Sequence, residues 1–410
     1  MQNHFIKVIL HGIITNMAQK YYKREAEALL NKAAEQFPAV LVTGSRQSGK
    51  ATLLKHRFPD YSWAGLDDLE TRRLANRDPE YFFSRFPPPV VIDEIQYAPD
   101  LLSYIKVRID KKRHLTGQFI LTGSQTFQVM KGVSETLAGR IAIFDLFPLT
   151  WNETLADRLF PTGVEGDQLL LQNLFRGFYP ELHVRPSIDY DLWFQSYVQT
   201  YIERDVRDIK AITNLYDFQA FMKLLAPRAG QLLNLSEIAK EVGIAFSTAK
   251  EWLSILESTY IVKLLRPYHN NHTKRVVKAP KLYFVDTGLL CYLLAVKSVD
   301  ILSQSPFLGN IFENMCIMEV VKYHEYTLAR EEIFFYRDAS KNEVDLVIKS
   351  AHELRAYEIK FTKTPKERML NGLIAFKKEF PQAKLHLASL DEKELGFRTA
   401  QCIHWTKLLS

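Results

Sequence analysis

Residues 44–50, GSRQSGK, form a glycine-bounded loop that ends in a lysine, and this combination can bind phosphate. Glycines let backbone N–H groups turn toward phosphate oxygens, and the amino end of a following helix adds positive charge. The apolar run before the loop predicts a strand and ATLLKHRF after it predicts a helix, which is the context that this motif requires. A nucleotide site, in which the lysine reaches the β- and γ-phosphates, is favoured over a plain strand–turn–helix corner. Its residues are Gly44, Ser45, Arg46, Gln47, Ser48, Gly49, Lys50, Ala51 and Thr52.

The position after the lysine usually holds Ser or Thr, whose hydroxyl ligates Mg²⁺, and here it holds Ala51. Thr52 lies about 100° farther round the expected helix, so we expect it to face elsewhere. Water can take the open coordination position, because Mg²⁺ readily keeps water ligands. We therefore expect ATP and Mg²⁺ to bind and hydrolysis to be slow.

Polar residues follow two further apolar runs. Asp93 and Glu94 come directly after VVI, and we expect Asp93 to hold Mg²⁺ and Glu94 to orient or deprotonate the attacking water. Ser124 follows the next expected strand, QFILT, and either contacts the γ-phosphate or is an ordinary turn residue. Arg140 either stabilises charge on the γ-phosphate or pairs with a carboxylate.

Several motifs together resemble a group of bacterial and archaeal AAA-type ATPases. They are GSRQSGK, LDD, VVIDEIQ, LTGSQ and LAGR, and the resemblance covers nearly the whole chain. It implies a P-loop domain, a winged-helix segment and a C-terminal domain of unknown function. It also implies that Lys50, Asp93 and Glu94 are the ATPase residues, and Ala51 departs from the usual Thr of that family.

A helix–turn–helix pattern occupies residues 235–259. We expect Ser236 to cap the first helix, Gly243 to make the turn and Ser247 to begin the second helix. Two expected strands and a polar loop then form a wing without Asp or Glu, which suits DNA phosphates. The alternative is a winged helix that serves as an interdomain lid. The basic residues of this stretch are Lys263, Arg266, Lys274, Arg275, Lys278 and Lys281.

Strand patterns return near the C-terminus in IFFYRD, KNEVDLVIK and LRAYEIKF. If residues 350–353 form a hairpin turn, Asp345 lies opposite Glu358 and Glu343 lies opposite Lys360 on one face. Like charges placed directly opposite each other are destabilising, and a bound cation would remove that cost. The other face is expected to hold Val344, Leu346, Ile348 and Ile359.

These charged residues match the D…E-x-K arrangement of metal-dependent nucleases of the PD-(D/E)xK type. The match implies that Asp345 and Glu358 hold Mg²⁺ and that Lys360 positions water or steadies developing charge. Glu313 resembles the additional helical acid of many such nucleases. The alternative is a hairpin whose charges pair with one another and face solvent, and the nuclease fold by itself does not establish cleavage.

The length of 410 residues indicates two or three domains. Three cysteines without a C-x-x-C pair argue against zinc and a disulfide framework and favour a cytoplasmic setting. No apolar run suggests a membrane span, and the net charge of +6 permits an anionic partner without requiring one. The predicted fold class is α/β, in four parts. They are a flexible extension (1–16), a parallel-sheet P-loop ATPase domain (17–205), a helical linker with a winged helix (206–285) and a restriction-endonuclease-like domain (286–410).

Two functions are open from the sequence. The first is a slow ATPase whose nucleotide state governs a winged helix and a nuclease-like domain on DNA. The second is a nucleotide-dependent regulatory switch or binding module without phosphodiester chemistry. The substrate sequence and the oligomeric state are not specified by these patterns.

Overall fold

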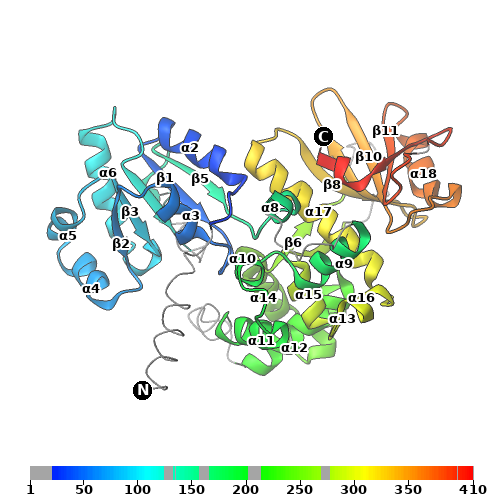
Figure 1. Ribbon diagram of the computed structural model, residues 1–410, viewed down its shortest axis with the longest axis horizontal. Helices are drawn as coiled ribbons and strands as arrows, with labels where there is room; N and C mark the ends of the chain where they lie inside the picture. The colour runs from blue at the N-terminus through cyan, green and yellow to red at the C-terminus, as the bar shows by residue number, and fades with distance from the viewer. Residues whose placement is uncertain are drawn as a thin grey trace, which may run out of the picture.

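The chain forms two lobes joined side by side (Figure 1). We call residues 26–145 the N-terminal lobe and residues 151–409 the C-terminal lobe, with residues 146–150 crossing between them. The computed structural model describes residues 21–123, 133, 135–156, 166–201, 214–268, 278–394 and 396–409. The predicted extension 1–16 and the residues Ser124, Lys274 and Arg275 lie outside this part.

The N-terminal lobe is built on a parallel five-stranded sheet in the order β2-β3-β4-β1-β5. Parallel strands are covered on both faces, which explains why the sequence of each strand reads as a short apolar run. The predicted parallel sheet of a P-loop domain is therefore confirmed. The strands are β1 (Ala39–Thr43), β2 (Ser62–Gly65), β3 (Val90–Asp93), β4 (Phe119–Thr122) and β5 (Ile141–Asp145).

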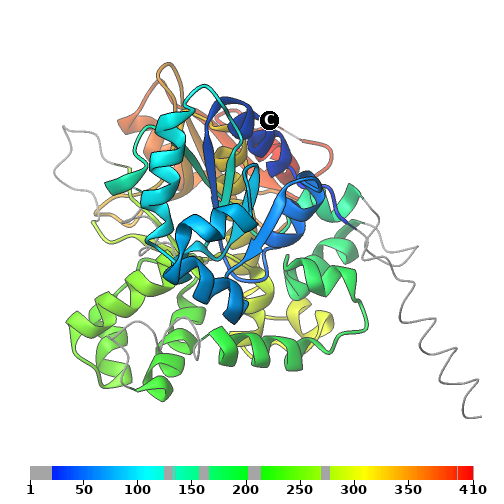
Figure 2. The same cartoon turned by 90° about the vertical axis from the view of Figure 1, so that its left-hand side faces the viewer.

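Helices cover both faces of this sheet (Figures 1 and 2). On one face Val40 and Val42 join a cluster with α2 and α3, and on the other Ala39 and Leu41 pack with α5 and α6. This alternation follows the two-residue period of a strand. The helices are α2 (Ala26–Gln36), α3 (Lys50–Arg57), α4 (Leu69–Arg77), α5 (Pro79–Arg85) and α6 (Leu101–Lys111), with a 3₁₀ turn at Ile95–Tyr97.

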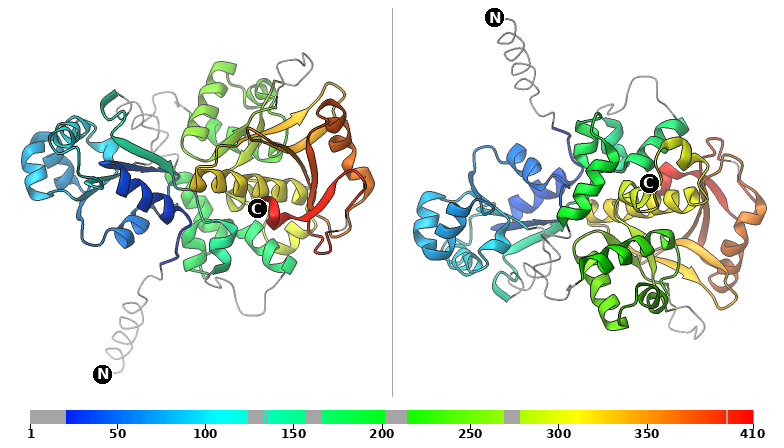
Figure 3. Two further views of the ribbon diagram at one scale, coloured as in Figure 1. Left: turned by 90° about the horizontal axis from the view of Figure 1, so that it is seen from above. Right: turned by 90° about the horizontal axis from the view of Figure 1, so that it is seen from below.

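The C-terminal lobe is organised around α17 (Leu308–Thr327), which runs through its middle with other helices on either side (Figure 3). α17 is buried on most of its surface, and its buried residues include the charged Glu313, Glu319 and Lys322 as well as apolar side chains. Two helices from the predicted ATPase range, α9 and α11, pack against α15 in this lobe. The helices before α17 are α8 (Trp151–Ala156), α9 (Gly166–Arg176), α10 (Pro180–Val184), α11 (Tyr190–Tyr201), α12 (Leu215–Leu225), α13 (Leu235–Val242), α14 (Phe246–Ser258), α15 (Thr287–Leu293) and α16 (Val299–Ser303).

Helices α13 and α14 are followed by an antiparallel hairpin of β6 (Val262–Leu265) and β7 (Lys281–Phe284). Gly243 makes the turn with φ +84°, as expected, but Asn234 rather than Ser236 caps α13. The order of elements suits a winged helix, which stays a prediction. Lys281 is fully buried, so its predicted place on an exposed basic wing is wrong.

A second sheet completes the lobe in the order β12-β11-β10-β9-β8. The hairpin pairing of Leu354 with Lys349 is confirmed. The outer strand β8 is not an open edge, because the Phe335 N–H donates to the Arg266 carbonyl at 3.1 Å and the Phe335 carbonyl accepts the Tyr268 N–H at 2.6 Å. The elements are β8 (Glu332–Arg337), β9 (Glu343–Lys349), β10 (Leu354–Ile359), α18 (Asn371–Glu379), β11 (Lys384–Ser389) and β12 (Gln401–His404).

The faces of β9 differ from the prediction. The register between β8 and β9 shifts by one residue, since Phe334 pairs with Val347 but Tyr336 pairs with Val344. Val344 therefore packs in the cluster around α18, whereas Leu346 packs in the cluster around α17. The expectation that both side chains share one face is wrong, because an extra residue in a strand reverses the alternation beyond it.

Among the described helices, none combines the length and the apolarity that crossing a bilayer needs.

Candidate nucleotide-binding site

The loop between β1 and α3 has backbone conformations that favour glycine. Gly44 and Gly49 have φ of +138° and +92°, and Gln47 has φ +61°. A Cβ at Gly44 would lie 2.1 Å from the Leu146 carbonyl oxygen, so no larger residue fits there. Loops in which left- and right-handed residues alternate commonly turn successive N–H groups toward an anion. The predicted strand–loop–helix corner is thus present.

Lys50 begins α3 and lies over this loop. Its ammonium donates to the carbonyl oxygens of Gly44 and Ser45, each at 2.9 Å. The side chain is buried to 8% exposure, yet it borders a cavity beside the loop. A positive group is therefore held where the loop would meet phosphate.

Asp93 and Glu94 stand at the end of β3, and Thr122 at the end of β4 connects them. The Thr122 hydroxyl donates to Asp93 Oδ1 at 2.5 Å and accepts the Glu94 N–H at 3.0 Å. Gln96 donates to Glu94 Oε2 at 2.5 Å. Burial raises the pKa of Asp93, with the hydrogen bond from Thr122 acting in the opposite direction.

Thr122 is a site residue that the sequence analysis missed. Ser124 was the expected polar residue at this strand end, and it lies outside the described part of the chain. The sequence does show a threonine at the end of the apolar run FILT. Because β3 and β4 are neighbours in the sheet, this threonine lies beside Asp93. In a parallel sheet the carboxyl ends of neighbouring strands meet at one edge.

The cavity beside the loop has a volume of about 390 Å³ and lies between the lobes. Residues of α3 and β3 form one wall: Lys50, Ala51, Thr52, Asp93 and Glu94. Residues along α11 form the opposite wall: Trp193, Ser196, Tyr197 and Thr200. Ser196 and Thr200, four residues apart, share one face of α11.

A second cavity of about 230 Å³ shares Gln47, Gly49 and Thr52 with the first. Tyr22, Pro180 and Val184 are among its other lining residues, so apolar and aromatic surface faces it. Thr52 borders both cavities whereas Ala51 borders the first, and the expectation that Thr52 faces elsewhere stays a prediction.

Arg140 is not at the phosphate loop. It lies at the start of β5, where its carbonyl oxygen accepts the Ala39 N–H at 3.3 Å, and its Nε donates to Asp110 Oδ1 at 2.7 Å. The loop follows the carboxyl end of the parallel strands, and Arg140 precedes the amino end. A role at the γ-phosphate within this chain is therefore wrong, and the alternative of a carboxylate partner is confirmed.

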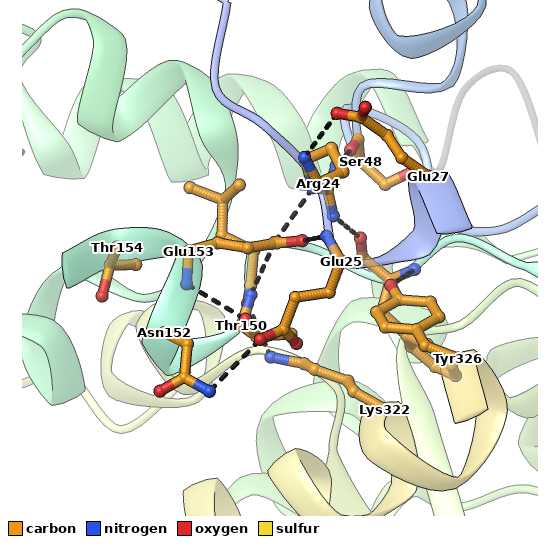
Figure 4. A network of polar contacts seen from close by, with 12 residues as sticks. Arg24, Glu25, Glu27, Ser48, Thr150, Asn152, Glu153, Thr154, Lys322 and Tyr326 are labelled. Carbon is orange, nitrogen blue, oxygen red and sulfur yellow. Dashed lines mark hydrogen bonds and ion pairs between the residues drawn. The ribbon is translucent and has the colours of Figure 1, made fainter. Parts of the chain in front are cut away.

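A buried arginine joins the phosphate loop to the C-terminal lobe (Figure 4). Arg24 is 4% exposed, and its guanidinium donates to Glu153 at 2.9 Å, to the Ser48 carbonyl at 2.8 Å and to the Phe147 carbonyl at 2.7 Å. Ser48 belongs to the loop, Phe147 to the crossing segment and Glu153 to α8. One cation therefore bonds to three parts of the molecule.

Helix α17 continues this network from the other side. Lys322 donates to the Leu149 carbonyl at 2.7 Å and to Glu319 at 2.8 Å, and Glu319 also accepts the Trp151 N–H at 2.8 Å. The Tyr326 hydroxyl accepts the Phe147 N–H at 3.0 Å. The crossing segment is therefore held by Arg24 on one side and by α17 on the other.

The predicted nuclease residues also come together, but with a lysine among them. Lys281 Nζ lies 2.6 Å from Glu343, 3.1 Å from Glu313 and 3.4 Å from Asp345. Lys360 lies 2.6 Å from Glu358 and 3.3 Å from Asp345.

The predicted Mg²⁺ site of Glu313, Asp345 and Glu358 does not fit this arrangement. In the described parts of the chain, no three His, Cys, Asp or Glu side chains are placed to hold one metal ion. Burial raises the pKa of Glu358, and the nearby charge of Asp345 raises it further. Burial would also raise the pKa of Asp345, but Lys360 and Lys281 hold it below its usual value.

The sheet, the loop and the strand-end acids define an AAA-type P-loop ATPase. Residues 36–155 match the AAA domain, residues 167–300 a domain of unknown function (DUF8612) and residues 308–408 another domain of unknown function (DUF4143). Uncharacterized protein Rv2008c of Mycobacterium tuberculosis and Uncharacterized protein Mb2031c of Mycobacterium bovis are each 30% identical over 349 residues, 84% of this chain and 75% of theirs. The chain belongs to this family of AAA-type P-loop ATPases.

Two solved structures match parts of the chain with TM-scores below 0.5. The Walker-type ATPase paby2304 of Pyrococcus abyssi is 14% identical, with a TM-score of 0.47 over 68% of this chain and 97% of that one. A DNA replication initiation factor is 16% identical, with a TM-score of 0.25 over 57% and 85% of the two chains. The family assignment stands on the sequence relatives.

Replacing Thr122 by Val should lower the kcat of ATP hydrolysis by about 10–100-fold, the usual effect of removing a hydrogen bond to a metal-binding carboxylate. Loss of the hydroxyl should also raise the pKa of Asp93, which moves the acid limb of the kcat–pH profile to higher pH. The exposed Thr116, near the opposite edge of the sheet, supplies the matched variant Thr116→Val. Equal kcat values and equal kcat–pH profiles for Thr122→Val and Thr116→Val would show that Thr122 has no role in the site.

Proposed function

We propose that the protein binds ATP and Mg²⁺ between its lobes, hydrolyses the nucleotide and thereby changes how the C-terminal lobe is held. The observation that carries this proposal is the 390 Å³ cavity, which has the phosphate loop on one wall and α11 on the other. A ligand in that cavity contacts both lobes. Conversion of ATP to ADP then changes their relative stability, because a ligand shifts a conformational equilibrium by its differential contacts.

The residues of the first wall suit this chemistry. Backbone N–H groups of the loop and the ammonium of Lys50 would bind the phosphates, and Asp93 would hold Mg²⁺. When bound, Mg²⁺ neutralises phosphate charge. Glu94 would orient the attacking water, and Thr122 holds both acids in place. The second cavity beside Gly49, lined in part by Tyr22, Pro180 and Val184, has room for the base.

Hydrogen bonds of buried charged side chains connect the phosphate loop to the crossing segment and to α17, so the proposed change would pass through them. Arg24 bonds directly to the Ser48 carbonyl of the loop, and Lys322 of α17 bonds to the Leu149 carbonyl of the crossing segment. A shift of the loop around phosphate therefore acts on groups that also bond to α17. This favours a nucleotide-dependent switch.

DNA contact by the α13–α14 region is a second proposed function. Ser247 and Lys250 are exposed at the start of α14, and Arg266 and Lys278 are exposed beside the described ends of the wing. Exposed cations in this position suit phosphate contacts. Cleavage of DNA is the weaker candidate, because Lys281 lies between the carboxylates that would bind the metal.

Lys50→Ala should abolish ATP binding, since the loop loses its ammonium, and calorimetry should show no heat. Normal binding by Lys50→Ala would refute the site.

Ala51→Thr should raise kcat, because a hydroxyl is restored where Mg²⁺ is usually ligated. Steady-state phosphate release measures kcat. An unchanged kcat in Ala51→Thr would show that this position does not limit the reaction.

The double variant Glu319→Gln/Lys322→Met should uncouple the lobes. It removes a buried charge pair without leaving either charge unpaired, a replacement that is often neutral for stability. We expect ATP to bind as before, while the ATP-dependent change in hydrogen exchange of α17 is lost.

The surface pair Glu394 and Lys407, joined at 2.6 Å, supplies the matched control Glu394→Gln/Lys407→Met. This control should keep the ATP-dependent exchange change. The same exchange change in both double variants would exclude transmission through Glu319 and Lys322.

Lys250→Glu should weaken binding of a fluorescent DNA duplex and reduce the slope of log Kd against log salt by about 1, as expected for one lost phosphate contact. Lys32→Glu, an equal charge change on the exposed surface of α2, should leave the slope unchanged. Fluorescence anisotropy at several salt concentrations measures both. Failure of the unaltered protein to bind the duplex, or equal effects of the two variants, would sink this proposal.

A further inference from the structure

The carboxylates of the C-terminal lobe enclose an ammonium group. The side chain of Lys281 is 1% exposed, and three carboxylates from α17 and β9 lie within 3.4 Å of its Nζ. The Tyr283 hydroxyl donates to Glu313 at 2.7 Å and holds that acid beside the lysine. A lysine buried to this degree requires compensating charge, and part of it comes from Glu313 and Asp345, two of the acids that the D…E-x-K pattern assigns to a metal.

The ammonium of Lys281 occupies the space between these carboxylates. The Nζ–oxygen separations of 2.6–3.4 Å are those of ion pairs and hydrogen bonds. Mg²⁺ requires oxygens at about 2.0–2.1 Å in near-octahedral geometry. The three acids are spaced around Lys281, so they cannot also close on a smaller ion while its ammonium remains between them.

The charges of the cluster are also nearly balanced without a metal. Four carboxylates (Glu313, Glu343, Asp345, Glu358) face three cations (Lys281, Arg337, Lys360). The difference is a single negative charge. A divalent ion added to the cluster would leave excess positive charge in a buried place.

Lys281 comes from outside the segment that carries the acids. It lies in β7, within the matched range 167–300, whereas Glu313, Glu343 and Asp345 lie within the matched range 308–408. The ion pairs therefore fasten the β6–β7 hairpin to α17 and to β9. The adjoining segment bonds to the β8 edge through Arg266 and Tyr268, which extends the same junction.

We propose that Lys281 takes the place of the divalent cation in this D…E-x-K cluster, so that the cluster binds the β6–β7 hairpin instead of a metal. The C-terminal domain then has no metal-dependent cleavage activity, and its acids bind an internal lysine. This proposal does not depend on ATP binding or hydrolysis.

The test is Mn²⁺ binding by the full chain without nucleotide, followed by electron paramagnetic resonance of free Mn²⁺. The unaltered protein and Asp345→Asn should bind the same amount, because the cluster takes no metal. Lys281→Met should gain one Mn²⁺ site, since the acids lose their cation, and the double variant Lys281→Met/Asp345→Asn should lack it. Mn²⁺ should raise the Tm of Lys281→Met more than that of the double variant.

Three results would overturn the proposal. The first is an Mn²⁺ site in the unaltered protein that Asp345→Asn removes. The second is Mg²⁺-dependent nicking of a plasmid that Asp345→Asn abolishes. The third is a folded Lys281→Met variant that gains no site. If Lys281→Met does not fold, Lys281→Arg keeps a cation among the acids and should fold without gaining an Mn²⁺ site. The comparison of Mn²⁺ binding by the unaltered protein and by Asp345→Asn then decides the question by itself.

Discussion

The structure depends on one buried cation, the guanidinium of Arg24. A buried charge is tolerated only when its hydrogen bonds are satisfied, and Arg24 finds its acceptors in three places: Glu153, the Ser48 carbonyl and the Phe147 carbonyl. Moving any of these groups away leaves a charge unsatisfied in the interior. The phosphate loop, the crossing segment and α8 are therefore constrained to move together.

The two charged centres of the molecule contain similar residue types with different surroundings. Asp93 and Glu94 border an open cavity next to Lys50, and ligand can reach them. Asp345 and Glu313 lie buried around Lys281, and the ammonium already meets their charge. Carboxylates alone thus do not define a metal site, because the group that neutralises them decides what they do.

Features made by neighbours along the chain could be predicted. The phosphate loop, the acids after β3 and the pairing of Leu354 with Lys349 each follow from a short local pattern. Features made by distant segments could not. Thr122 meets Asp93 only because β3 and β4 are adjacent in the sheet, and α11 reaches the cavity only because the lobes pack together.

Short patterns of residues predicted the parallel sheet, the phosphate-binding corner and the family, because strand periodicity and glycine geometry act over a few residues. Other features exist only in the folded chain. Lys281 enters an acidic cluster, one extra residue in β9 reverses its faces, and Arg140 lies at the amino end of the parallel strands, away from the phosphate loop. The physical reason is that burial and electrostatics depend on which segments meet in space, and no local pattern of residues specifies that meeting.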